Sequence, residues 1–340
     1  MVVVQAGGSV GDRMDVGVFC RQSNVVVVVG KGGVGKTTVT AALALAAARA
    51  GLEVLVVALD DSGGLPALYG RDDRFGYSPV RLVDALSGPG GGVSGQVVTS
   101  RDALLEYLEG HGLGRVSKRL VQSGALDVVA TAIPGIEQVL VLGKVKQVER
   151  AGTFDLVLVD APATGHAVSF LTSSGGLVDA ARGGPLRAQA EQVVELLSDP
   201  ARCQALLVTV PEETPVNEVV ETAYRLEDEV GIALGPVVVN ACLPVLGHLG
   251  VDPLLAARAA GEGPPDLPHR RLLSMAAAFR AARQEVQAEQ LGRLAAALPL
   301  AQVTLPYLFD QPIGPAGLSL LAGRLARGIE ALDGVAGARA

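Results

Sequence analysis

The order of apolar and polar stretches along the chain predicts alternating strands and helices. Five consecutive valines at 25–29 precede a glycine-rich turn and an alanine- and leucine-rich stretch at 37–50, and a second apolar run follows at 53–59. Continuous apolar runs of this length are typical of strands buried on both faces. A strand, a helix and a strand in this order form a right-handed parallel crossover. The pattern therefore predicts an α/β fold with a mostly parallel, twisted sheet flanked by helices.

Similar patterns extend to the end of the chain and predict its domain organisation. We expect one domain over 24–335 after a flexible, glycine-interrupted leader at 1–23, with a helical insertion at about 66–152 and 172–200. Further strands are predicted at 154–160, 205–210, 236–240 and 301–305, and helices at 81–86, 100–109, 116–120, 135–150, 185–197, 215–229, 253–260, 271–298 and 315–332.

Composition narrows the class of protein. About 49% of the 340 residues are hydrophobic and 19% are charged, which supports a large core and argues against disorder. The net charge of −7 argues against a broad basic surface for nucleic acid. Three scattered cysteines form no C-x-x-C pair, and no run of ~20 apolar residues predicts a membrane helix. We expect a cytoplasmic protein, with peripheral contact to a membrane as the alternative.

Residues 30–37 match the phosphate-binding pattern G-x-x-x-x-G-K-[ST] at every position. Its glycines let backbone N–H groups approach phosphate oxygens, and the next helix directs its positive end at the same charge. The pattern predicts a P-loop NTPase in which Lys36 contacts the β- and γ-phosphates and Thr37 binds Mg²⁺. The alternative is a glycine-rich turn with a chance lysine. The loop residues expected to contact ATP or ADP are Gly30, Gly32, Gly33, Val34, Gly35, Lys36, Thr37 and Thr38.

Lys31 is a second lysine, directly after the first glycine of the loop. A long cation there cannot easily turn back onto its own γ-phosphate, but it can reach a phosphate across a dimer interface, as an arginine finger does in trans. The alternative is a solvated loop lysine. With this residue the loop resembles the deviant Walker A group, G-K-G-G-x-G-K-[ST], which includes partition ATPases, nitrogenase iron protein and arsenite-pump ATPases.

Two predicted strands end in aspartates that suit phosphate chemistry. Asp60 follows the second strand and is predicted to orient the attacking water, although Asp61 adjoins it and a surface turn with two acids is the alternative. Asp160 ends a later strand and occupies the Walker B position, where it would hold Mg²⁺ through water. Gly165 then offers an N–H group to the γ-phosphate.

The Asp160–His166 segment, followed by Phe170 and Leu171, resembles the arsenite-pump ATPase family, which includes the targeting factors for tail-anchored membrane proteins. Segments 134–137, 211–213 and 237–240 resemble the same family, and the likeness covers roughly 25–330. The resemblance implies that Glu212 and Asn240 contact the nucleotide, that the Asn240 amide reads the adenine edge, and that Pro306 belongs to a base-contacting loop. For His166, a switch residue and an ordinary histidine at a helix start remain open.

Several departures from this family limit the function that can be inferred. The segment 60–65 replaces the usual Asp-Pro-Ala-His-x-Leu, so the first switch can move differently. There is one phosphate loop, no thiol cluster for arsenite, no C-x-x-C zinc clasp, and no methionine in the insertion. These absences argue against arsenite pumping and against a methionine-rich client groove.

The resemblance implies a Mg²⁺-dependent ATPase, a bacterial offshoot of the family, that hydrolyses ATP at a dimer interface to switch a helical client-binding surface. Its partners would be a second copy or a paralogue, and a client protein of unknown identity that can be membrane-associated; nucleic acid is not expected. The alternatives are a partition or positioning ATPase, and a weakly hydrolysing partner subunit of a paralogous ATPase.

Overall fold

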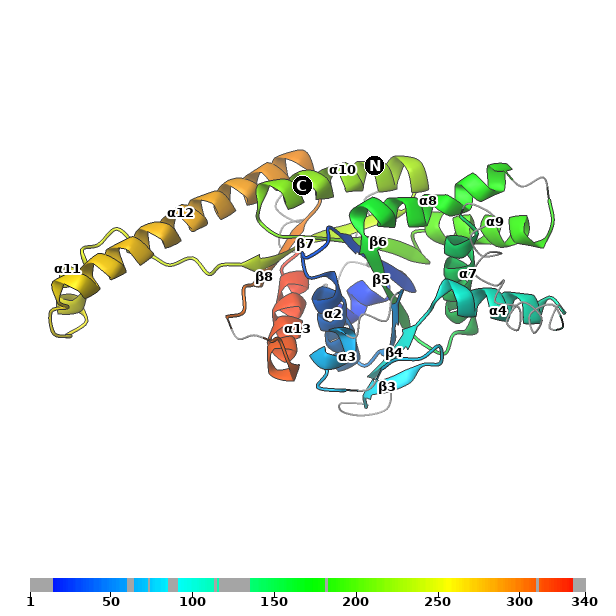
Figure 1. The fold of residues 1–340 in the computed structure, drawn as a ribbon, viewed down its shortest axis with the longest axis horizontal. Helices are drawn as coiled ribbons and strands as arrows, with labels where there is room; N and C mark the ends of the chain where they lie inside the picture. The colour runs from blue at the N-terminus through cyan, green and yellow to red at the C-terminus, as the bar shows by residue number, and fades with distance from the viewer. Residues whose placement is uncertain are drawn as a thin grey trace.

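An eight-stranded sheet forms the centre of the protein (Figure 1). The computed structural model describes residues 15–59, 64–72, 74–84, 91–112, 115, 135–180, 183–309 and 312–332. The strand order is β3-β4-β2-β5-β1-β6-β7-β8, and every pair is parallel except β3 with β4. The strands are β1 (Val25–Gly30), β2 (Glu53–Ala58), β3 (Val80–Val83), β4 (Gly92–Val97), β5 (Leu156–Ala163), β6 (Cys203–Thr209), β7 (Ala233–Cys242) and β8 (Gln302–Pro306).

Helices cover both faces of the sheet, which confirms the predicted α/β class. In β1 the valines alternate: Val25, Val27 and Val29 join the core on one face, and Val26 and Val28 join the core on the other. The face of Val26 is covered by α1 (Val16–Cys20), α2 (Lys36–Arg49), α3 (Gly64–Leu68) and α13 (Pro315–Glu330). The face of Val25 is covered by α4 (Ser100–Gly110), α7 (Ile136–Ala151), α8 (Thr164–Ala180), α9 (Pro185–Ser198), α10 (Glu213–Arg225) with a π-helical turn (Leu226–Val230), and the end of α12 (Leu267–Ala297).

The helix predicted at 81–86 is wrong over its described residues 81–84, because 80–83 form β3. Together β3 and β4 extend the sheet within the range assigned to the helical insertion. The strand β4 was missed because Gly92 and Gly95 are typical of a loop. At Gly95 a Cβ atom would lie 2.5 Å from the ring of Phe75, so the glycine makes room for an aromatic side chain on the strand. The predicted helix at 116–120 lies outside the described residues.

Residues 15–23 do not belong to the flexible leader that the sequence predicts at 1–23. Asp15 caps the short helix α1 by accepting a hydrogen bond from the backbone N–H of Val18 at 2.8 Å. Val16, Phe19 and Cys20 are buried in the core beneath α2 and α13. Residues 15–23 therefore belong to the folded domain, and 1–14 lie outside the described residues.

One part of the chain extends away from the sheet. The short helix α11 (Pro253–Ala259) and the first two thirds of α12 form a projection on one side of the molecule (Figure 1). Neither they nor any other helix in the described part of the chain is long and apolar enough to cross a bilayer. The remaining predicted elements are found within a few residues of their expected bounds.

Candidate functional site

The glycine-rich loop connects the central strand β1 to α2 with tight backbone geometry. Gly33 and Gly35 have φ values of +87° and +89°, a region that glycine enters without strain. Gly30 lies against β6, where a Cβ atom would come within 2.2 Å of the Val208 carbonyl oxygen. The 14-residue helix α2 begins at Lys36 directly after this turn, with Thr37 and Thr38 in its first turn. The loop therefore presents backbone N–H groups at a helix N-terminus, which is the arrangement that binds phosphate.

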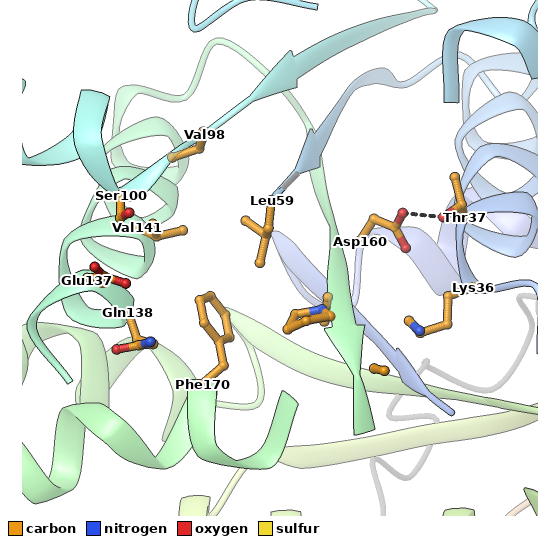
Figure 2. A pocket seen from close by; sticks show the side chains of 13 residues that line it. Lys36, Thr37, Leu59, Val98, Ser100, Glu137, Gln138, Val141, Asp160 and Phe170 are labelled. Carbon is orange, nitrogen blue, oxygen red and sulfur yellow. Dashed lines mark hydrogen bonds between the residues drawn. The ribbon is translucent and has the colours of Figure 1, made fainter. Parts of the chain in front are cut away.

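Thr37 and Asp160, predicted from separate motifs, are in contact. The Thr37 hydroxyl donates a hydrogen bond to Asp160 Oδ2 at 2.6 Å (Figure 2). Strand register explains the contact, since Asp160 in β5 lies opposite Val28 of β1 on one side and Ala58 of β2 on the other. A hydroxyl and a carboxylate are the hard oxygen donors that Mg²⁺ prefers, so this pair fits a magnesium ion.

A cavity of about 340 Å³ opens beside this pair. Lys36, Thr37 and Asp160 line one side, while Glu137 of α7 and Phe170 of α8 line the other (Figure 2). The Lys36 ammonium folds back over the loop and donates to the Lys31 carbonyl oxygen at 3.3 Å. The cavity thus joins the phosphate loop to helices α7 and α8.

Three further residues predicted to contact nucleotide lie along the same carboxyl edge of the sheet. The Asn240 amide donates a hydrogen bond to the Val34 carbonyl oxygen at 2.9 Å, so it supports the phosphate loop. Glu212 is the exposed residue before α10, 3.4 Å from an Arg283 nitrogen. Pro306 ends β8 and lies opposite Cys242 of β7.

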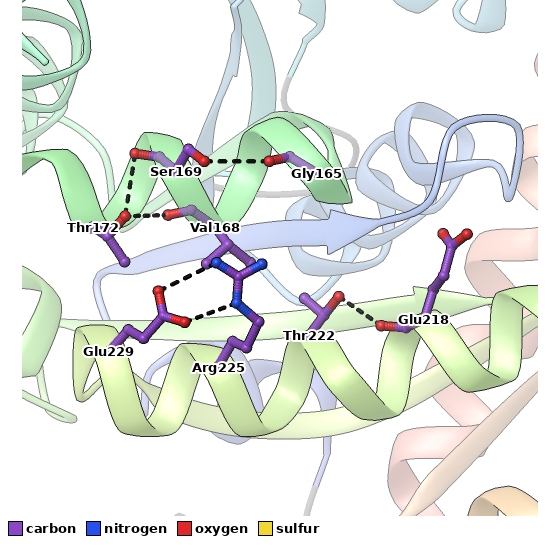
Figure 3. A network of polar contacts seen from close by, with 8 residues as sticks. All are labelled: Gly165, Val168, Ser169, Thr172, Glu218, Thr222, Arg225 and Glu229. Carbon is purple, nitrogen blue, oxygen red and sulfur yellow. Dashed lines mark hydrogen bonds and ion pairs between the residues drawn. The ribbon is translucent and has the colours of Figure 1, made fainter. Parts of the chain in front are cut away.

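Lys31 forms an ion pair that the sequence did not indicate. Its ammonium lies 2.5 Å from Glu218 Oε1, and both side chains are about one-third exposed. Glu218 lies on α10, where its carboxylate points away from the neighbouring Arg225–Glu229 pair (Figure 3). The two residues are 187 positions apart, and nothing in a single sequence connects them. The lysine is thereby directed to α10 of its own chain.

The two switch segments differ in how far they can be described. Asp60 and Asp61 lie outside the described residues, two and three positions after β2 ends at Ala58. Gly165 and His166 are exposed in the first turn of α8. The Gly165 carbonyl oxygen accepts a hydrogen bond from the Ser169 hydroxyl at 3.3 Å (Figure 3).

None of the three cysteines is suited to bind a metal ion or to act as a nucleophile. Cys20, Cys203 and Cys242 are all buried, and burial raises the pKa of each thiol, to about 12 for Cys20 and about 11 for Cys242. Metal-binding and nucleophilic cysteines need the thiolate form, which burial disfavours here. Within the described ranges no three His, Cys, Asp or Glu side chains form a cluster that could hold a metal ion.

Comparison with known proteins places these features in a family. The profile of the anion-transporting ATPases matches residues 23–177, which include the phosphate loop and Asp160. The chain is 35% identical over 247 residues to the ATPase BagA of Mycobacterium tuberculosis, covering 71% of this chain and 70% of that protein. It is 30% identical over 327 residues to protein Rv2184c of the same species, covering 87% and 74% of the two chains.

A more distant relative comes from a fungus. The ATPase GET3 of Blastomyces gilchristii is 28% identical over 153 residues, which cover 43% of this chain and 41% of that one. Together with the sheet order and the phosphate loop, these similarities establish that the chain belongs to the anion-transporting ATPase family and is an ATPase.

Proposed function

We propose that the chain binds MgATP in the cavity beside the phosphate loop and hydrolyses it at an interface with a second subunit. The observation that carries this proposal is the 2.6 Å contact between Thr37 and Asp160 at the N-terminus of α2. It brings a Walker A hydroxyl and a Walker B carboxylate to one point. Backbone N–H groups from Gly30 to Thr38 and the Lys36 ammonium would bind the phosphates.

A magnesium ion would fit at the Thr37 hydroxyl and the Asp160 carboxylate. Thr37 would contribute its hydroxyl directly, and Asp160 would bind the ion through water. When bound, the ion neutralises negative charge on the β- and γ-phosphates. The protein's own residues supply the position, because register between β1 and β5 fixes the Asp160 carboxylate against the Thr37 hydroxyl.

Residues at the carboxyl ends of β6, β7 and β8 would recognise the adenine base. Asn240 uses one amide hydrogen on Val34, which leaves its second hydrogen and its carbonyl oxygen to pair with an adenine edge. Glu212 and Pro306 border this end of the sheet and would contact the nucleoside. Gly165 would donate its N–H to the γ-phosphate.

Hydrolysis would combine a base in one subunit with a lysine from the other. Asp60 would orient the attacking water, and Lys31 would reach the phosphate of the partner's nucleotide. Lys31 would first have to leave Glu218, and an ion pair this exposed stabilises by only about 0–1 kcal/mol, so a phosphate can displace the carboxylate.

A client surface would follow from the position of α7 and α8. Glu137 and Phe170 line the cavity and belong to the helical layer with α4 and α9, so an occupied site would press directly on that layer. The partner subunit would be a second copy or a paralogue, and the client a protein, membrane-associated ones included.

A mixing experiment tests the shared site. Lys31→Ala protein keeps Asp60, and Asp60→Asn protein keeps Lys31, so in a mixed dimer one site has an intact base and receives an intact lysine. We expect each parent to be inactive and the mixture to regain phosphate release. Glu218→Gln serves as the control, since it frees Lys31 and should leave turnover intact. No recovery in a mixture shown by mass spectrometry to contain heterodimers would reject the trans role.

A further inference from the structure

A second cavity lies among the helices that cover the Val25 face of the sheet. Its volume is about 490 Å³, within the range of roughly 300–1,000 Å³ that small-molecule sites occupy. Helix α7, which packs against both α4 and α9, supplies much of its lining (Figure 1). The second cavity and the ATP site share α7 but no lining residue. On that helix the ATP site uses residues 137, 138 and 141, and the second cavity uses 140 and positions between 143 and 150.

Lys146 brings a buried positive charge to the second cavity. The residue is only 6% exposed, and its ammonium donates hydrogen bonds to Gln189 Oε1 at 2.9 Å and to Gln192 Oε1 at 2.7 Å. Both partners are neutral amides, and Lys146 forms no ion pair with any residue that the structure describes. An ammonium has three N–H donors, so one is left for a ligand in the cavity.

The surroundings of Lys146 lack the opposite charge that a buried ammonium normally has. Burial lowers the pKa of Lys146, and the positive charges of Arg150 and Arg202 lower it further. Glu195 acts in the opposite direction, but it is the last and smallest of these effects. Buried charges are costly unless they are paired, so an anion bound beside Lys146 would offset this cost.

Arg150 adds a second cation on the same side of α7. It follows Lys146 by four positions, about one turn of the helix, and its exposed guanidinium has no partner among the described residues. Lys144 also lines the cavity, but its ammonium is already paired with Glu106 Oε1 at 2.7 Å. The other carboxylate of the lining, Glu109, is exposed to water. Two cations therefore lack a carboxylate partner, and together they suit a group with two negative charges.

An amide and two stacked rings complete the lining. Helix α7 has a glycine at 143, where a Cβ atom would lie 1.8 Å from Gln189 Nε2, so the Gln189 amide lies against this helix. Its oxygen accepts from Lys146, and its NH₂ group is left to donate to a ligand. Tyr107 and His111 line the same cavity with their ring centroids 4.1 Å apart. Such rings offer an apolar wall to the organic part of a ligand.

We propose that the second cavity binds a small molecule that carries a phosphate group. The phosphate lies at Lys146, Arg150 and Gln189, and the rest of the molecule lies beside Tyr107 and His111. A phosphate monoester brings two charges to the two cations, whereas a single carboxylate would neutralise only one. The site goes beyond the ATP site and does not depend on hydrolysis.

Titration calorimetry with phenyl phosphate tests the site. Full-length protein is kept in excess MgADP, so that the phosphate loop is occupied. We expect Lys146→Gln and Arg150→Gln each to weaken binding at least about 10-fold, because each removes a charge-assisted hydrogen bond. Arg150 is exposed, so its variant keeps the test valid even if Lys146→Gln does not fold. Lys36→Ala, which alters the phosphate loop, should leave the affinity for phenyl phosphate unchanged.

Arg101→Gln is the matched control. Arg101 is exposed on α4, and at about 100° per residue it lies on the side of that helix opposite to the residues that line the cavity. Its loss should change the affinity by less than about 2-fold, because salt screens a distant surface charge.

Four results would overturn the proposal. Wild-type protein would fail to bind phenyl phosphate at about 10 mM, a concentration at which even a weak site is occupied. Arg150→Gln would bind as tightly as wild type, or Arg101→Gln would weaken binding as much as Arg150→Gln does. Benzoate would bind as tightly as phenyl phosphate, which would reject the phosphate group. Loss of binding in Lys36→Ala would instead place the ligand on the phosphate loop.

Discussion

Adding one methyl group to the phosphate loop should reveal how it is held. Gly35 has φ +89° and ψ +33°, a left-handed conformation that costs a residue with a Cβ atom about 1–2 kcal/mol. The added Cβ would also lie 2.3 Å from Asn240 Nδ2 and would displace the amide from the Val34 carbonyl oxygen, which costs about 1 kcal/mol. Reduced freedom of the unfolded chain returns about 0.5 kcal/mol. Gly35→Ala should therefore lower the free energy of unfolding by about 2 kcal/mol.

Urea denaturation followed by circular dichroism measures this loss. Gly32→Ala is the matched control, because its φ is not positive and its Cβ would meet only the Ala163 Cβ at 3.7 Å, an ordinary contact. We expect its stability to stay within about 0.5 kcal/mol of wild type. Asn240→Ala removes the group that Gly35→Ala displaces, so the double variant should be about 1 kcal/mol more stable than the sum of the single effects predicts.

Two outcomes would refute this reasoning. If Gly35→Ala is as mild as Gly32→Ala, the left-handed turn is not required by the fold. If the effects of Gly35→Ala and Asn240→Ala are additive, the amide does not hold the loop in solution.

Three further predictions concern the rest of the fold. A hydrogen bond from Arg202 lowers the pKa of the buried Glu149 carboxyl below its ordinary 4.5, so the pair stabilises the fold above pH 4.5 and loses this effect as pH falls through the lowered pKa. Glu149→Gln should therefore lower the free energy of unfolding by about 1–2 kcal/mol at pH 7 and by less at pH ~4, as measured by urea denaturation at each pH. All three thiols should resist Ellman's reagent at pH ~8 until the protein unfolds, because burial raises the pKa of Cys20 to about 12 and the other two are also buried; fast labelling of the native protein would contradict this. Gly95→Ala should destabilise by about 1–3 kcal/mol through overlap with Phe75, and a neutral result in thermal unfolding would show that the ring has room to move.

The parts of the fold that could be predicted are those with a local signal. The valine run of β1, the glycines of the loop and the alanine-rich α2 are contiguous, so periodicity and residue type were sufficient. Asp160 could be linked to Thr37 because parallel strands bring their carboxyl ends to one edge. The strand β4 was missed because Gly92 and Gly95 are typical of a loop in the sequence, although Gly95 makes room for Phe75 in the folded protein.

Side-chain contacts over long separations could not be predicted. The pairing of Lys31 with Glu218 depends on how α10 packs beside the loop, and the hydrogen bond from Asn240 to Val34 depends on the register of β6 and β7. Each joins segments about 190 to 210 positions apart. Packing decides such contacts, and a residue pattern along one segment does not contain them.

Titration calorimetry with MgATP tests the central claim most directly. The wild-type protein should bind nucleotide at one site per chain, and Lys36→Ala should weaken that affinity at least about 10-fold, because charge-assisted hydrogen bonds to the phosphates are lost. Circular dichroism should show the same fold for both proteins. An unchanged affinity in correctly folded Lys36→Ala would contradict the assignment of the loop from Gly30 to Thr37 as the ATP site.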